Sequence, residues 1–112
     1  MRNIRHHLMT TQQFVASEAY RQLKPVDLLF VDGYHSAEQA CFDHEAFQEH
    51  LSAIALVLFH DSTAISVSKV YGQEKRYDCR VKDYIDVLKK NAAWQVFDLP
   101  FGDGVTLVRR AT

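Results

Sequence analysis

Carboxylate and imidazole side chains follow two apolar runs of the sequence, where they could take part in catalysis or ligand binding. The segment Asp32–His35 comes directly after Val26–Val31, and the pair His60-Asp61 comes directly after Ile54–Phe59. Runs rich in Val, Ile and Leu suit strands that are buried on both faces, as in a parallel sheet under helices. Ligands of open α/β sheets bind beyond the carboxyl ends of the strands, so the candidate site is placed at these two segments.

A helix is expected between the two strands. Ser36 is a good N-cap residue for a helix from about Ala37 to Leu51, in which Phe42 and Phe47 lie on one apolar side. Strand, helix and strand within this length form a βαβ unit with parallel strands. The solvated side of the helix is expected to hold Asp43, His44, Glu45, Glu49 and His50.

The remaining elements follow from similar patterns. Thr10 or Thr11 caps a helix that runs to Leu23, and Lys24-Pro25 ends it because proline disfavours helical geometry in the preceding residue. The other segments are predicted to be a short edge strand at Ile4–Met9, a helical turn and long connection at Ser62–Arg80, a helix from Val81 that closes at Lys89–Asn91, a strand at Trp94–Leu99, a turn at Pro100–Gly104 and an antiparallel strand at Val105–Val108.

Length and composition describe an ordinary globular protein. The 112 residues are 47% hydrophobic and 24% charged, which suits a single domain, residues 1–112, with a modest core. A net charge of -1 gives no electrostatic footprint for nucleic acid or an anionic membrane. Cys41 and Cys79 show no pairing pattern, and the first residues lack the apolar core of a signal peptide. A cytoplasmic protein with reduced thiols is therefore expected.

The order of these motifs resembles the C-terminal half of class I S-adenosylmethionine-dependent methyltransferases, over roughly Val26 to Arg110. The likeness is carried by D-L-L-F-V-D-G-Y-H-S, L-V-L-F-H-D-S and W-Q-V-F-D-L-P-F-G-D-G-V-T-L-V-R-R, with a helix after each of the first two. The small-molecule O-methyltransferases are the most similar group. The resemblance implies an α/β, Rossmann-like partial methyltransferase domain. Its mostly parallel sheet would have helices on both faces and a C-terminal antiparallel hairpin, whose last strand inserts between its neighbours.

The same resemblance implies roles for the polar strand ends. Asp32, His60 and Asp61 match positions that hold a divalent cation in the metal-dependent O-methyltransferases, where the cation orients and acidifies the acceptor hydroxyl. His35 lies near the position where catechol-type enzymes carry a basic residue for that proton. Oxygen ligands suit magnesium, and a histidine among them also admits manganese, iron or zinc. The implied cofactors are S-adenosylmethionine and magnesium or another divalent metal, and the implied substrate is a small-molecule acceptor.

One motif of that family is absent from the sequence. The glycines are Gly33, Gly72, Gly102 and Gly104, and none of these four belongs to a G-x-G turn after a strand. The cofactor-binding residues are therefore unknown from the sequence. The chain is interpreted as a methyltransferase-type domain truncated on its N-terminal side, either a fragment or a degenerate relative.

Three functions are consistent with these features. The first is metal-assisted methyl transfer from S-adenosylmethionine to an oxygen of a small molecule. The second is a non-catalytic α/β module that pairs with a second copy or a partner chain through the strand edge at Val26–Val31, because open strand edges invite pairing. The third is a metal-dependent hydrolase built on Asp32, His35, His60 and Asp61. Asp32-Gly33 is equally consistent with a simple turn before the helix, and His35 with a solvated loop residue.

Overall fold

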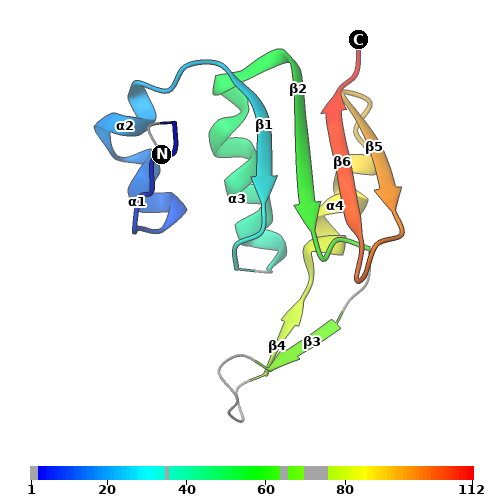
Figure 1. The fold of residues 1–112 in the computed structure, drawn as a ribbon. Coiled ribbons are helices and arrows are strands. Elements are labelled where there is room, and N and C mark those ends of the chain that lie inside the picture. Colours follow the sequence, from blue (N-terminus) through cyan, green and yellow to red (C-terminus); the bar gives the residue numbers. More distant parts are fainter. Residues whose placement is uncertain (1–2, 35, 64–65, 70–75) are drawn as a thin grey trace.

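The computed structural model describes residues 3–34, 36–63, 66–69 and 76–112, with the backbone alone for residues 66–69 and 76–79. Strands and helices alternate along much of the chain (Figure 1). The elements are α1 (Thr11–Val15), α2 (Glu18–Arg21), β1 (Val26–Val31), α3 (Ala37–Phe47), a 3-10 turn (Gln48–His50), β2 (Leu51–His60), β3 (Ser66–Lys69), β4 (Arg76–Cys79), α4 (Val81–Lys89), β5 (Trp94–Leu99) and β6 (Val105–Arg110).

The main sheet has four strands in the order β1-β2-β6-β5. Strands β1 and β2 are parallel and are joined through α3, which confirms the predicted βαβ unit. Strand β6 runs antiparallel to both of its neighbours, so β1, β2 and β5 all point the same way. The mixed α/β class and the inserted hairpin strand are therefore as the sequence implied.

Helices α3 and α4 contact each other and cover the same face of the sheet (Figure 1). Alternate strand residues, among them Val57, Phe59 and Val108, point toward these helices and are almost completely buried. Helix α4 contributes Ile85 and Leu88, which follow each other at helical spacing on its apolar side. The hydrophobic core of the described residues thus lies in one layer, between the sheet and the α3–α4 pair.

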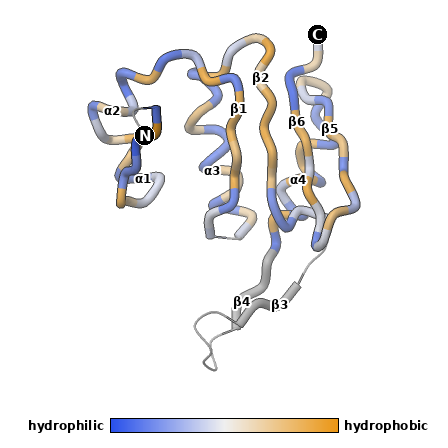
Figure 2. The backbone as a smooth tube through the Cα atoms, in the orientation of Figure 1, coloured by the Kyte–Doolittle hydropathy of each residue, from blue (hydrophilic) through white to orange (hydrophobic). Residues whose placement is uncertain are grey.

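The opposite face of the sheet is uncovered, and we call it the open face. Its large apolar side chains are exposed, namely Leu28, Phe30, Ile54, Leu56 and Phe97, with the half-buried Leu58, Val105 and Leu107 among them. Strands β1 and β2 are hydrophobic along most of their length (Figure 2). The expectation of helices on both faces is therefore met on one face only, because no helix of the described residues packs on the other.

Three predictions from the chain pattern are wrong. Residues 4–9 form no strand, and Ile4 and Leu8 are exposed. The single helix expected before Lys24 is divided into α1 and α2, because the Ser17 side chain accepts a hydrogen bond from the backbone N–H of Tyr20 and begins a second helix. The segment expected to be a helical turn and a long connection contains the antiparallel pair β3–β4.

The solvated side of α3 was predicted correctly for Glu45 and Glu49, which are exposed, but incorrectly for its other three residues. Asp43 is buried, His44 is completely buried, and the His50 side chain is mostly covered. His44 lies between the sheet and α4, with its ring against Phe59, Tyr84 and Trp94. Because α3 packs against both the sheet and α4, a wider part of its surface is buried than one apolar stripe would indicate.

Candidate functional site

The ends of β1 and β2 bring three predicted site residues together. Val31 pairs with Phe59 in the parallel ladder, so the residues that follow each strand emerge side by side at the same edge of the sheet. The Nδ1 atom of His60 lies 3.1 Å from an Asp32 carboxylate oxygen and 3.1 Å from an Asp61 carboxylate oxygen. One ligand atom from each residue fits within 4.8 Å of the other two. Two carboxylates and one imidazole thus converge, and a donor set of this kind could hold a divalent cation.

Asp61 takes an unusual backbone conformation at this point. Its φ of 52° lies in the left-handed region, which aspartate tolerates better than most residues other than glycine. The chain therefore turns sharply as it leaves β2, while the carboxylate stays beside His60. The geometry of the cluster depends on this turn as well as on the strand register.

The segment after Asp61 is held by the turn between β5 and β6. The backbone N–H of Ser62 donates to the Gly104 carbonyl at 3.3 Å, and that of Thr63 donates to the Asp103 carbonyl at 3.1 Å. A Cβ atom on Gly104 would lie 2.0 Å from the Thr63 hydroxyl oxygen, so only glycine permits this approach. Next to Thr63 in the chain, the Ser62 hydroxyl forms a buried hydrogen bond of 2.6 Å with the hydroxyl of Thr106 on β6. These contacts hold one side of the cluster in place.

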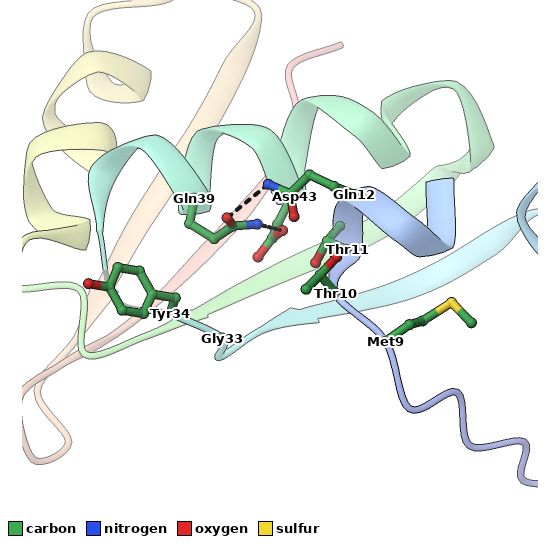
Figure 3. Close-up of a pocket in the computed structure, with 8 residues that line it drawn as sticks. All are labelled: Met9, Thr10, Thr11, Gln12, Gly33, Tyr34, Gln39 and Asp43. Atoms are coloured by element: carbon green, nitrogen blue, oxygen red, sulfur yellow. Dashed lines mark hydrogen bonds between the residues drawn. The ribbon is translucent and has the colours of Figure 1, made fainter. Parts of the chain in front are cut away.

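A pocket of about 270 Å³ opens beside the end of β1 (Figure 3). Its polar wall is a chain of side-chain hydrogen bonds, in which the Gln12 amide donates to Gln39 at 3.0 Å and the Gln39 amide donates to Asp43 at 2.7 Å. Tyr34 stands at one end of the pocket and Met9 at the other (Figure 3). The remaining lining residues are Thr10, Thr11 and Gly33.

Little in the sequence indicated this pocket. Thr10 and Thr11 stood out only as candidate helix caps, and Thr10 does cap α1, with its hydroxyl accepting from the backbone N–H of Gln13. The pocket forms because α1 and the start of α3 flank the end of β1, although they are distant in the chain. The available signal was the density of amide and hydroxyl side chains at residues 10–13.

The predicted site residues therefore divide into two groups. Asp32, His60 and Asp61 lie together, next to Gly33 and Tyr34, which line the pocket. His35, the predicted proton acceptor, lies outside the described residues.

Comparisons with known proteins concern the family and the fold of this chain. A family model described as "Methyltransferase domain" matches residues 1–62. The crystal structure of the SAH-bound Podospora anserina methyltransferase PaMTH1 is similar, with a TM-score of 0.54 and 18% sequence identity. The match covers 85% of this chain and 46% of that one, so this chain spans about half the length of the solved protein. A comparison with curated proteins found no match. At this identity the structural likeness concerns the fold.

Proposed function

Because the chain belongs to the methyltransferase-domain family whose model matches residues 1–62, we propose that it serves in S-adenosylmethionine-dependent methyl transfer to an oxygen of a small molecule, with a divalent metal assisting. The observation that carries this proposal is the convergence of Asp32, His60 and Asp61 at the carboxyl ends of two parallel strands, next to a polar pocket. Ligands of α/β sheets bind at such strand ends.

The donor set fits a hard or borderline divalent cation. Asp32 and Asp61 would supply oxygen ligands and His60 a nitrogen ligand, which suits magnesium or manganese. A cation held there would orient the acceptor hydroxyl and lower its pKa. Asp32 and His60 are partly exposed, so an acceptor could approach the cluster from solvent. His35 is proposed to take the acceptor proton.

The pocket of Figure 3 is the proposed place for the adenine end of the cofactor. Tyr34 offers an aromatic face on which a purine could stack, and base–aromatic stacking contributes about 1–3 kcal/mol per base. Thr10, Thr11 and Gln39 offer hydroxyl and amide groups that could hydrogen-bond to the edge of the ring. The sequence has no glycine-rich turn for the rest of the cofactor. The chain thus provides one side of the cofactor site, and residues outside it would complete that site.

Calorimetric titration with Mg²⁺ and Mn²⁺ tests the metal site. The wild type is expected to bind one of these ions, and Asp32→Asn and Asp61→Asn are expected to weaken binding at least about tenfold, because each removes a charged ligand. Asparagine keeps the side-chain shape and tolerates the left-handed backbone at position 61. Asp103→Asn is the matched control, since this exposed carboxylate lies in the β5–β6 turn outside the cluster.

A second titration, with S-adenosylmethionine in the presence and absence of Mg²⁺, tests the cofactor part of the proposal. Binding that is weak but measurable is expected, because only one side of the site is present. Absence of metal binding by the wild type, or equal affinity in Asp61→Asn, would overturn the metal site. Absence of cofactor binding would overturn the assignment of the pocket.

A further inference from the structure

A chain of polar side chains begins at the residue after Asp61 and ends on α4. The Ser62 hydroxyl lies 2.6 Å from the Thr106 hydroxyl on β6, and both side chains are almost completely buried. Thr106 donates to one carboxylate oxygen of Asp98 on β5 at 2.7 Å, and Lys89 at the end of α4 donates to the other oxygen. We call these four residues the hydrogen-bond chain. It connects the segment beside the proposed metal cluster to two strands and a helix.

Asp98 determines the direction of the hydrogen-bond chain. Burial acts to raise the pKa of the Asp98 carboxyl, but the hydrogen bonds from Lys89 and Thr106 outweigh it and lower that pKa, so the group is a carboxylate at neutral pH. A carboxylate only accepts hydrogen bonds, so the single hydrogen of the Thr106 hydroxyl is donated to Asp98. Ser62 must then donate to Thr106, and its hydroxyl has no hydrogen left for the neighbouring Asp61 carboxylate.

The turn at Asp61 depends on contacts of this kind. Its φ of 52° is a left-handed conformation, which costs free energy in any residue other than glycine and persists only where surrounding contacts hold it. The next residue supplies two such contacts, because the backbone N–H of Ser62 donates to the Gly104 carbonyl and its buried hydroxyl donates to Thr106. The second contact reaches the interior of the sheet, where β6 pairs with both β2 and β5.

We propose that Thr106 and Asp98 are positioning residues for the metal site: by holding Ser62, they fix the turn that keeps the Asp61 carboxylate beside His60. The Asp61 carboxylate lies 3.1 Å from Nδ1 of His60, and neither Thr106 nor Asp98 belongs to the cluster itself. Groups that orient metal ligands from outside the ligand set commonly contribute about 10–100-fold to metal affinity. This inference rests on the proposed metal site, but the turn can also be observed without metal.

Calorimetry with Mg²⁺ and Mn²⁺ measures the effect on the metal site. Thr106→Val keeps the shape of the side chain and removes its hydroxyl, so metal affinity is expected to fall about tenfold. Thr106→Ser restores the hydroxyl and is expected to bind metal as the wild type does. Leu51→Val is the control for a general loss of stability, because it removes a buried methylene group at the start of β2, at the opposite end of that strand from Asp61. It is expected to leave metal affinity unchanged.

A second pair of variants tests Asp98. Asp98→Ala removes the acceptor that orients the Thr106 hydroxyl, so it is expected to weaken metal binding about as much as Thr106→Val does. Asp86→Ala is the matched control, because it removes a similarly exposed carboxylate that pairs with Lys82 on α4, outside the hydrogen-bond chain. Its metal affinity is expected to equal that of the wild type. Equal losses in the two variants would show an effect of net charge and would contradict a positioning role for Asp98.

Amide hydrogen exchange measures the turn in the metal-free protein. The backbone N–H groups of Ser62 and Thr63 are expected to exchange about tenfold faster in Thr106→Val, relative to those of α3, because the turn has lost one of its contacts. Unchanged relative exchange at the turn, or wild-type metal affinity in Thr106→Val, would overturn the positioning role. A wild type that binds neither ion would overturn the proposed metal site instead, and the exchange rates alone would then decide whether Thr106 holds the turn.

Discussion

The hydroxyl of Tyr84 lies 2.7 Å from Nδ1 of His44, and both side chains are buried between α3 and α4. Burial lowers the pKa of His44 to about 4, and the nearby charge of Arg110 acts in the same direction. Burial also raises the pKa of Tyr84. The pair is therefore neutral at physiological pH, and protonation of His44 would place an uncompensated charge in the core.

Stability should fall in mildly acidic solution because of this histidine. In the unfolded chain His44 binds a proton near its ordinary pKa of 6.5, whereas in the folded chain it does so near 4. The contribution of neutral, buried His44 to the free energy of unfolding is about 3 kcal/mol. It is fully present above pH 6.5 and is lost as the pH falls from 6.5 to 4. Urea unfolding at a series of pH values measures the loss. His44→Gln, which cannot titrate, should show a flatter profile, and an unchanged profile would contradict the assignment.

The Ser62–Thr106 hydrogen bond should couple β6 to the segment that follows Asp61. Thr106 also donates to the Asp98 carboxylate at 2.7 Å, so Ser62 is the donor in the 2.6 Å contact between the two hydroxyls. Thr106→Val should cost about 1–3 kcal/mol of unfolding free energy, because it leaves the buried Ser62 hydroxyl without this acceptor. The double variant with Ser62→Ala should cost less than the sum of the single variants. Simple additivity in chemical denaturation would show that the two groups do not interact.

The two glycines of the β5–β6 turn should respond differently to alanine. Gly104 has a φ of +100°, and its added methyl group would meet Thr63, whereas Gly102 has a φ of +57° and open space around it. Gly102→Ala should therefore cost about 1–2 kcal/mol, which is the strain of the left-handed backbone alone. Gly104→Ala should cost at least about 2 kcal/mol more, because Thr63 must move as well. Thermal unfolding of the two variants compares them, and equal costs would contradict the close approach.

The pocket beside β1 predicts a specific effect on cofactor affinity. Tyr34→Ala should weaken binding of S-adenosylmethionine about tenfold, since it removes the aromatic face available for stacking. Phe101→Ala is a suitable control, because Phe101 is an equally exposed aromatic residue in the β5–β6 turn and does not line the pocket. Calorimetry under the conditions of the wild-type titration gives both affinities. Similar losses in the two variants would argue against a stacking role for Tyr34.

Several features of the fold could be predicted from local patterns. The apolar run at Val26–Val31 and the strand at Trp94–Leu99 have the expected bounds, because side-chain type and turn residues determine them locally. The ends of β1 and β2 could be identified as a candidate site for the same reason. The pairing of these two strands then brings Asp32 and His60 together.

The remaining features depend on contacts between distant segments. Strands β1 and β2 are apolar on both faces. This pattern does not show whether helices of this chain pack on the second face of the sheet. His44 is polar and was expected in solvent, but α4 and Trp94 enclose it from elsewhere in the chain. The pocket also escaped prediction, because it forms between α1 and α3, on either side of the βαβ unit's first strand. Local spacing carries no information about such packing.

The position of β6 has a consequence for how the chain reaches its folded state. This strand follows the other strands of the main sheet in sequence, yet it lies between β2 and β5 and pairs with both. During synthesis the four-stranded sheet cannot form completely until residues 105–110 have emerged, and until then β5 lacks β6, its ladder partner among the described residues. The pairing of His60 with Val105 also joins residues far apart in the chain, and such non-local contacts slow folding. Nascent chains would thus expose unpaired strands for longer than chains with neighbouring partners, and assistance from chaperones would matter most at this stage.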